Sequence, residues 1–427
     1  MLIAGGRLVD PSGPVDALRD LRIADGVIVE IGEHLAPRDG EQTIDAGGAV
    51  VAPGFIDMHV HLREPGFPEK ETIESGTRAA LRGGFSAIAC MPNTRPALDD
   101  PAVIRSLLDE LAARAHVRVY PIGAITRGRL GNEPCDIPSL ARAGAVAFSD
   151  DGNTVMNARV LRDAALRALV VPGVFISHAE DEHLKGDALM HEGAVSRQLG
   201  VAGSPAVAED VIVARDLLIG METGKLWHIA HLSTAGALAA MLHARAYGAN
   251  ATCEVTPHHL LLTDETVRER GAEGKVNPPL RTEHDARLLR DAVRDGSVDA
   301  FATDHAPHTA AEKSGDLKTA AVGFTGLEVA VGAYALAVPD LPLLRFVALL
   351  STNPARILNV AGGTLRVGAA ADVTIFAERE WRVDPAQFAS KGKATPFAGR
   401  VLPRRVLATI VNGALLFHGD AEYEIAP

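Results

Sequence analysis

Cysteine is scarce in this sequence, and its few copies lie far apart. Only Cys90, Cys135 and Cys253 occur in 427 residues, and no CxxC pair is present. An odd and scattered set argues against a disulfide framework and is typical of a reducing compartment. We therefore expect a cytoplasmic protein in which Cys135 and Cys253 only pack the interior.

Long apolar runs and concentrations of basic residues are also missing. No run reaches the roughly 18 apolar residues that a membrane helix needs, and the first residues lack the pattern of a signal peptide. The net charge is −12, with no cluster of Lys and Arg, so neither nucleic acid nor membrane is an expected partner. The expected partner is a small-molecule substrate, and an anionic one would need local positive charge from metal ions or arginine.

The two ends of the chain resemble each other and differ from the middle. Residues 1–52 and 364–427 read as short strands cut by turns, with hairpin signals at 24–26 and 412–413. Neither end shows a convincing helical pattern. We expect one small β-sandwich domain that is assembled from both ends.

The middle, residues 53–363, alternates apolar segments with helical ones. Eight apolar segments end in polar residues: 50–62, 85–93, 117–126, 144–151, 170–181, 226–234, 250–259 and 298–308. Helical patterns such as 99–115 and 204–220 lie between them. Strands that alternate with helices form a parallel sheet, and eight such units predict a (β/α)₈ TIM barrel. The functional site of that fold lies at the carboxyl ends of its strands.

Metal-binding residue types gather at these predicted strand ends. Asp57, His59, His61 and Arg63 come at alternate positions, which share one face of a strand. A single histidine is more often a core or capping residue, but an HxH pair on one face is suited to a metal. Further candidates end other strands: Asp150, Asp151, His178, His231, Asp304, His305 and His308. Imidazoles with carboxylates suit Zn²⁺. They are too many for one tetrahedral site, so we infer two ions that share a bridging hydroxide.

Two motifs, DMHVHLREP (57–65) and ATDHAPHTAAEK (302–313), resemble the signatures of the dihydroorotase family in the amidohydrolase superfamily. The likeness continues in CMPNT (90–94), FSDDG (148–152), ISHAED (176–181), VTPHHLLL (255–262), KVNPPLR (275–281) and TPFAG (395–399). The resemblance implies a hydrolase that reversibly converts L-dihydroorotate to N-carbamoyl-L-aspartate in de novo pyrimidine (UMP) biosynthesis. It also implies two Zn²⁺ ions, or other divalent metals, as cofactors.

The resemblance further implies a role for each motif residue. His59 and His61 would bind one metal and His178 and His231 the other, with Asp151 bridging them. Asp304 would complete the first metal's shell and, as the catalytic residue, transfer protons. The implied substrate contacts are His61, Arg63, Asn93, Asn277, His308 and the backbone near Val322 and Gly323. Among these, Arg63 and Asn93 would hold the substrate carboxylate. Asp57, the first residue of the alternating pattern, would orient a histidine without itself binding metal.

No lysine lies between Lys70 and Lys185. The carboxylated-lysine bridge of hydantoinases, dihydropyrimidinases and allantoinases is therefore excluded, and the chain is similar to the class I, long-chain, aspartate-bridged dihydroorotases. Strand alternation turns Asp150 away and favours Asp151 as the bridge. Two alternatives stay open: a related cyclic amidase of the allantoinase or hydantoinase kind, and a non-catalytic partner subunit of aspartate transcarbamoylase. A homodimer and a complex with that transcarbamoylase are the further partner hypotheses.

Overall fold

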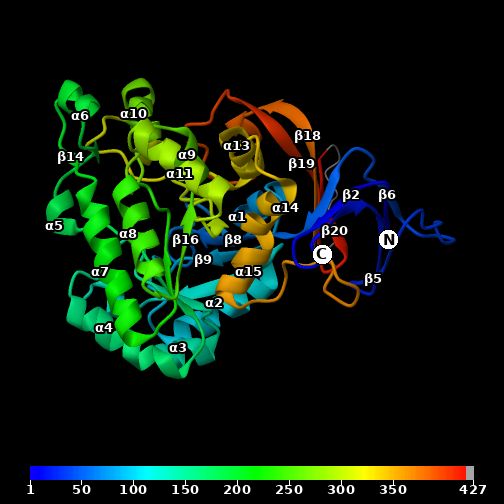
Figure 1. The fold of residues 1–427 in the computed structure, drawn as a ribbon, viewed down its shortest axis with the longest axis horizontal. Coiled ribbons are helices and arrows are strands. Elements are labelled where there is room, and N and C mark those ends of the chain that lie inside the picture. The colour runs from blue at the N-terminus through cyan, green and yellow to red at the C-terminus, as the bar shows by residue number, and fades with distance from the viewer. Residues whose placement is uncertain (420–427) are drawn as a thin grey trace.

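An eight-stranded parallel barrel forms the larger part of the molecule (Figure 1). The computed structural model describes residues 1–419. The barrel strands, in neighbouring order, are β8 (Phe55–Val60), β9 (Phe85–Cys90), β10 (Arg118–Gly123), β11 (Ala147–Ser149), β12 (Val174–Ser177), β15 (Trp227–Ile229), β16 (Ala251–Val255) and β17 (Ala300–Phe301). A parallel bridge from Val60 to His305 joins the first strand to the last, and the His61 amide donates to the His305 carbonyl at 2.9 Å. The predicted (β/α)₈ barrel is confirmed.

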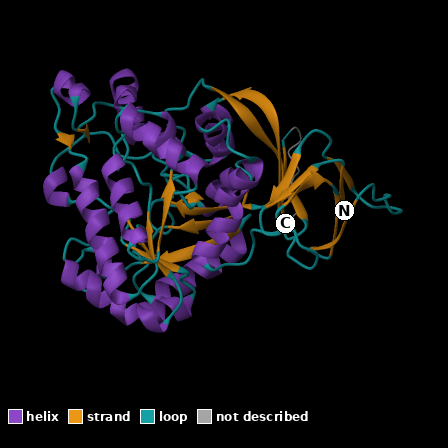
Figure 2. Cartoon of the chain, in the orientation of Figure 1, coloured by secondary structure: helices purple, strands orange, loops and turns teal. Residues whose placement is uncertain are grey.

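Helices surround the barrel strands (Figure 2). The longer ones are α1 (Ile73–Arg82), α2 (Pro101–Arg114), α3 (Ile137–Ala143), α4 (Ala158–Arg167), α7 (Val207–Thr223), α8 (Ala235–Ala246), α11 (Glu283–Asp295) and α13 (Ala330–Ala337). The shorter ones are α5 (Glu182–Lys185), α6 (Ala194–Leu199), α9 (Pro257–Leu261), α10 (Asp264–Arg270), α12 (Ala310–Lys313), α14 (Leu343–Val347) and α15 (Asn353–Leu358). A two-stranded sheet, β13 (Met190–His191) with β14 (Gly203–Ser204), lies between α5 and α7 along the chain.

Local sequence explains where these helices begin and end. The Asp100 side chain accepts from the Ala102 amide at the start of α2, where a proline occupies the first turn. Helix α11 ends at Gly296, whose φ of 94° is a left-handed conformation that glycine adopts readily. The helices predicted within 99–115 and 204–220 are confirmed as α2 and α7. Within the described residues, no helix combines the length and apolarity that a membrane crossing requires.

Both chain ends build the β-sandwich beside the barrel, and both termini are marked on that side in Figure 1. One sheet contains β5 (Val27–Gly32), β4 (Asp20–Ala24), β1 (Leu2–Ala4) and β6 (Thr43–Asp45); the other contains β20 (Ala414–His418), β19 (Val401–Val411), β18 (Val373–Arg382), β7 (Val50–Pro53), β2 (Arg7–Asp10) and β3 (Val15–Leu18). Their shared core joins Ile3 and Leu21 to Ile375 and Ile410. The predicted sandwich is confirmed. The domain boundaries predicted at 1–52, 53–363 and 364–427 stay predictions.

The first apolar segment, predicted as one strand over 50–62, is divided between the two units. Strand β7 pairs antiparallel with β18 of the sandwich, whereas β8 opens the barrel. Gly54 separates them, and a Cβ there would lie 2.2 Å from the Ser86 hydroxyl. Glycine permits this close approach of the backbone. A continuous apolar run hides such a break because both strands are buried.

Candidate metal centre and substrate cavity

Four histidines surround the carboxylate of Asp151 at the carboxyl ends of the barrel strands. His59 and His61 come from the end of β8, His178 from the end of β12 and His231 from the end of β15. From Asp151 Oδ1, His59 Nε2 is 3.4 Å away, His178 Nδ1 3.3 Å and His231 Nε2 3.4 Å. His61 Nε2 is 3.6 Å from Asp151 Oδ2. Each imidazole thus directs one nitrogen toward the same carboxylate.

The atoms of this cluster fit a metal better than they fit one another. His59 Nε2 and Asp151 Oδ1, which face each other, are buried without a hydrogen-bond partner among the described residues. Such orphaned groups are costly unless something else satisfies them. His178 Nδ1 and His231 Nε2 lie 2.9 Å apart. Zinc bonds of about 2.0–2.2 Å at tetrahedral angles separate neighbouring ligand atoms by roughly 3.3–3.5 Å, close to the spacing observed. Two overlapping groups, His59–His61–Asp151 and Asp151–His178–His231, each hold their ligand atoms within 4.8 Å of one another, with Asp151 in both.

Each of three histidines is held by a second residue on its other nitrogen. Glu254 Oε1 lies 2.7 Å from His59 Nδ1, and Glu180 Oε2 lies 3.0 Å from His178 Nε2. The Asn93 oxygen lies 2.9 Å from His61 Nδ1. Partners of this kind fix the ring orientation of metal-binding histidines.

Asp304 follows strand β17 and lies against the first pair of histidines. Its Oδ1 is 3.0 Å from His61 Nε2 and 3.6 Å from His59 Nε2. Asp304, His231 and Arg63 have positive φ values of 48°, 32° and 65°. Side chains with a Cβ rarely adopt this region, and residues held there concentrate at functional sites.

Within this buried cluster, opposite charges lower the pKa values of the two aspartates and raise that of His178. Burial opposes the ionised form of Asp151, yet His59 and the neighbouring imidazoles hold its pKa well below the ordinary value. Burial disfavours charge on His178, but Asp151 and Glu180 outweigh it and raise its pKa to about 9. The same imidazoles lower the pKa of Asp304 against the effect of burial. Sites that attract protons so strongly also attract metal cations, because the cation replaces the proton.

A cavity of about 210 Å³ opens above the cluster. Its lining residues are His61, Arg63, Asn93, Arg129, Asp151, Gly152, His178, His231, Val276, Asn277, Asp304, Ala306, His308, Val322 and Gly323. The structure therefore brings together every residue that the sequence assigned to substrate binding. His59 is the one assigned metal ligand that does not line the cavity, and it is fully buried.

Arg63 reaches the cavity through a turn rather than through the strand. Strand β8 ends at Val60, so the alternation that predicted a shared strand face with His61 stops before Arg63. Arg63 Nε donates to the Pro307 carbonyl at 3.1 Å, and its Nη2 lies 3.2 Å from His308 Nε2. His308 Nε2 also lies 2.8 Å from the Val322 carbonyl. This arrangement places a cation and two polar groups at one wall of the cavity.

Asn277 faces the cavity beside a buried salt bridge. In the amide orientation that satisfies both of its polar atoms, the Asn277 oxygen accepts from Lys185 Nζ at 2.6 Å. Lys185 also pairs with Glu180 at 2.6 Å. Because Glu180 contacts His178, this chain of contacts links a predicted substrate residue to a predicted metal ligand.

The role predicted for Asp57 is wrong. Its carboxylate accepts from the Thr303 hydroxyl at 2.5 Å, from the Thr303 amide and from the His59 amide at 3.1 Å, and it touches no imidazole. Asp57 thus joins β8 to the segment after β17, and Glu254 holds His59 instead. This contact depends on the closure of the barrel, which brings the first and last strands together.

Other neighbours of the motifs point away from the cluster. Asp150 accepts from the amides of Ile125 and Thr126, as strand alternation predicts. His305 lies 3.3 Å from Glu71, on the side opposite to the partners of Asp304. His259 contacts Thr256 and the Pro278 carbonyl and serves a structural role.

Sequence reasoning missed Glu180, Glu254 and Arg129. A signal existed for Glu254, because an acidic residue inside the buried strand β16 needs a partner. Glu180 follows His178 by two residues, a spacing that alone predicts no contact. Arg129 lies in the loop after β10, and nothing in the sequence distinguishes it from other surface arginines.

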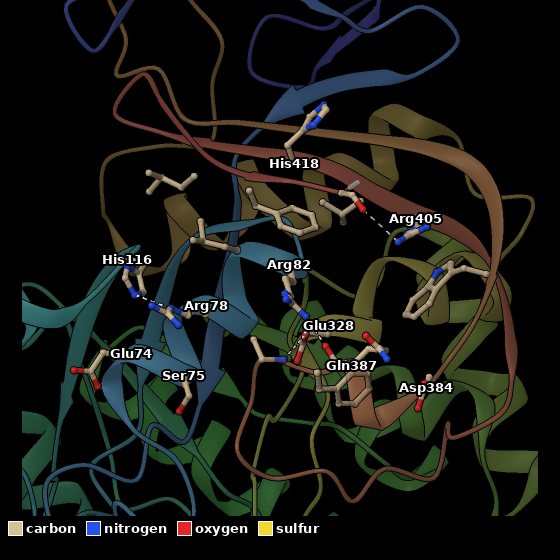
Figure 3. A pocket seen from close by; sticks show the side chains of 18 of the residues that line it. Glu74, Ser75, Arg78, Arg82, His116, Glu328, Asp384, Gln387, Arg405 and His418 are labelled. Carbon is tan, nitrogen blue, oxygen red and sulfur yellow. Dashed lines mark hydrogen bonds and ion pairs between the residues drawn. The ribbon is translucent and has the colours of Figure 1, made fainter. Parts of the chain in front are cut away.

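A second and larger groove of about 1720 Å³ lies elsewhere, between α1 and the strands β18, β19 and β20 (Figure 3). Arg82 and Glu328 point toward each other in it, 3.9 Å apart, and Arg78 donates to His116 at 3.2 Å. The residues that line this groove include no member of the histidine cluster. We therefore place the candidate site at the smaller cavity.

Comparison with known proteins adds an independent line of evidence. A family model described as dihydro-orotase-like matches residues 48–237, and one described as the amidohydrolase family matches residues 228–417. The dihydroorotase of Pelotomaculum thermopropionicum is 49% identical over 420 residues, which is 97% of this chain and 98% of that relative. The dihydroorotase of Anaeromyxobacter dehalogenans strain 2CP-1 is 46% identical over 426 residues, 98% of each chain.

Solved structures share the fold. An L-hydantoinase from Arthrobacter aurescens superimposes with a TM-score of 0.88 at 25% identity and covers 99% of this chain and 97% of its own. A D-hydantoinase from a Thermus species gives a TM-score of 0.84 at 24% identity, covering 99% and 96%. The second likeness concerns the fold alone.

Proposed function

Because this chain belongs to the dihydroorotase family, we propose that it interconverts L-dihydroorotate and N-carbamoyl-L-aspartate at the cluster around Asp151. The observation that carries the proposal is the direction of four imidazoles toward one buried carboxylate, beside a cavity that contains Arg63. The imidazoles and the carboxylate suit a metal centre, and Arg63 provides positive charge for an acidic substrate.

Two zinc ions, or other divalent metals, are the cofactors that we propose. His59, His61 and Asp304 would hold one ion, His178 and His231 the other, and Asp151 both. When bound, such ions supply a water-derived nucleophile at neutral pH and polarise the carbonyl that is attacked.

The residues of the chain then have separate tasks. In the hydrolytic direction an oxygen–carbon bond forms at the ring amide carbonyl and the carbon–nitrogen bond breaks. Asp304, ionised because of its low pKa, accepts the proton of the attacking water and passes it to the leaving nitrogen. The reverse direction closes the ring with the opposite proton transfer.

Substrate orientation would come from the other wall of the cavity. Arg63 is placed to bind a carboxylate with two parallel hydrogen bonds. Asn93 directs its oxygen to His61, which leaves its amide N–H groups for the same carboxylate. Asn277, His308 and the backbone at Val322 and Gly323 would contact the ring.

One competing function deserves a direct comparison, because the hydantoinase from Arthrobacter aurescens shares the fold over nearly the whole chain. Arg63 at the cavity favours an acidic substrate over hydantoin, dihydrouracil or allantoin. We expect the purified protein to hydrolyse dihydroorotate and to show little turnover of the three neutral rings. The proposal would be overturned if the protein hydrolysed a neutral ring rapidly and did not hydrolyse dihydroorotate.

The assembly of the protein is a separate proposal. A homodimer, and a complex with aspartate transcarbamoylase, would both appear in size-exclusion chromatography with and without that enzyme. An inactive, metal-free protein that binds the transcarbamoylase would instead support the scaffold alternative.

A further inference from the structure

Two buried glutamates lie behind the histidine cluster, on the imidazole nitrogens that face away from Asp151. Glu254 is 2.7 Å from His59 Nδ1, and Glu180 is 3.0 Å from His178 Nε2. Neither glutamate is among the residues that line the substrate cavity. Any effect they have on the reaction must therefore pass through the residues that they contact, which are the histidines and, for Glu180, also Lys185.

The contacts identify which nitrogen of each histidine carries hydrogen. A carboxylate only accepts, so the imidazole nitrogen hydrogen-bonded to Glu254 or Glu180 donates. The opposite nitrogen faces Asp151 and would give up its proton when a metal binds. His59 then bears its hydrogen on Nδ1 and presents Nε2 to Asp151, at 3.4 Å. His178 bears its hydrogen on Nε2 and presents Nδ1, at 3.3 Å. The two histidines use opposite ring nitrogens for the same task.

Glu254 is itself held firmly. His228 Nε2 lies 3.1 Å from its second oxygen, and the Thr252 hydroxyl lies 2.7 Å from the other nitrogen of His228. The His231 amide also donates to Glu254, at 3.3 Å. Glu254 therefore joins the ends of β8, β15 and β16. Of the predicted metal ligands, it contacts His59 through the imidazole and His231 through the backbone amide alone.

Glu180 is held differently. Lys185 pairs with the same carboxylate oxygen that faces His178, at 2.6 Å. This second partner holds the Glu180 carboxylate in place beside the imidazole. The two glutamates are thus independent supports, one for each histidine.

We propose that Glu254 and Glu180 are positioning residues that fix the tautomer and orientation of His59 and His178, each supporting one subsite of the metal centre. The inference rests on the proposed function, because it presupposes that the cluster binds metal. Loss of such a supporting partner weakens metal binding by about tenfold to a hundredfold.

The first test uses the unaltered protein, labelled with ¹⁵N at histidine and loaded with ¹¹³Cd²⁺. Nuclear magnetic resonance should detect cadmium–nitrogen coupling to Nε2 of His59 and to Nδ1 of His178. Coupling to the opposite nitrogen of either ring would overturn the inference. Absence of any metal binding would overturn the proposed function, and the inference with it.

The second test measures zinc affinity by competition with a chromophoric chelator in Glu254→Gln, Glu180→Gln and Glu209→Gln. The glutamine at 254 offers one acceptor oxygen to two imidazoles. We expect one binding step to weaken by about tenfold to a hundredfold in Glu254→Gln and a different step in Glu180→Gln. Glu209 is a matched control, since it is buried against Ser233 and Arg281 and touches no imidazole.

The outcomes separate the two proposals. Unchanged zinc affinity in Glu254→Gln and Glu180→Gln, with normal binding by the unaltered protein, would overturn the positioning role and leave the proposed function intact. An equal loss in Glu209→Gln would also overturn it, because the effect would then come from any buried glutamate. Should a variant fail to fold, the cadmium measurement on the unaltered protein decides.

Discussion

Two cavities of this protein, the groove beside β18–β20 and the pocket beside Asp151, differ in volume and in the hydrogen bonding of their polar atoms. The groove between α1 and β18–β20 is about 1720 Å³ and the cavity above Asp151 about 210 Å³. In the groove, Arg114 pairs with Glu74 at 2.8 Å, and Glu328 accepts from the Ala389 amide at 2.9 Å. Beside the cavity, by contrast, Asp151 Oδ1 and His59 Nε2 are buried without a hydrogen-bond partner among the described residues. Unmet bonding capacity, rather than volume, marks the site where a metal or substrate is expected.

Removing the Asp151 carboxylate, which both predicted metal subsites share, should have the largest effect on metal content and turnover. In Asp151→Ala, both predicted metal subsites lose a ligand, so we expect metal content to fall to background. Turnover should fall roughly a thousandfold or more. Elemental analysis and a dihydroorotate assay would measure both. Asp150→Asn is the matched control, because the Asp150 side chain accepts from the Ile125 and Thr126 amides in the loop after β10. Full metal content in Asp151→Ala would contradict the assignment.

Replacing the proton carrier should separate chemistry from metal binding. We expect Asp304→Asn to retain most of its metal, because the histidines and Asp151 remain, while kcat falls by about 10²- to 10⁴-fold. Asp384→Asn, in the large groove, should leave kcat unchanged. Normal turnover by Asp304→Asn would show that another group moves the proton.

Much of the site was predictable because a barrel gathers its strand ends. His59, Asp151, His178 and His231 each follow an apolar segment, and parallel strands that close into a barrel bring such ends together at one face. The side-chain chemistry of these residues, imidazole and carboxylate, then indicates a metal without knowledge of any distance. Fold and ligand types therefore follow from local patterns.

Contacts across the barrel seam were not predictable in the same way. The sequence shows that Asp57 shares a strand with His59, but its partner Thr303 lies 246 positions away. Glu254 likewise reaches His59 across 195 positions. The alternation of residues along one strand does not predict whether Asp57 or Glu254 contacts the His59 imidazole. That contact depends on the strand register around a closed sheet. The position of Arg63 was not predictable from alternation either, because the strand ends before Arg63 and the chain enters a turn.

A conservative change at the cavity should be smaller in effect and confined to substrate binding. Arg63→Lys keeps the charge but removes the planar pair of donors, so we expect KM for dihydroorotate to rise by about 10- to 100-fold. The change in kcat should be small. Arg78→Lys is the matched control in the groove, where Arg78 contacts His116. An unchanged KM in Arg63→Lys would place the substrate carboxylate elsewhere.

The groove itself should affect stability and not turnover, and Glu328 allows that to be measured. Burial raises the pKa of Glu328 to about 7 from the ordinary 4.5, although the Ala389 and Ser390 amides and Arg82 act in the opposite direction. The folded protein therefore keeps a proton that the unfolded chain releases above pH 4.5. The stability contributed by this group is present below pH 4.5 and is lost as the pH rises through 7. In Glu328→Gln the side chain stays neutral, so the free energy of unfolding should decline less over that interval, by up to about 3 kcal/mol.

Urea unfolding at pH 5 and pH 8 would measure the difference, with the dihydroorotate assay at pH 8 alongside. We expect the variant to gain stability relative to the unaltered protein at pH 8 and to keep its full turnover. Parallel pH profiles of the two proteins would mean that Glu328 is ionised in the folded state. A loss of turnover without a loss of stability would instead give the large groove a part in the reaction, and the contrast between the two cavities would fail. Because the groove and the histidine cluster lie at different parts of the fold, only a change in stability is expected from this variant.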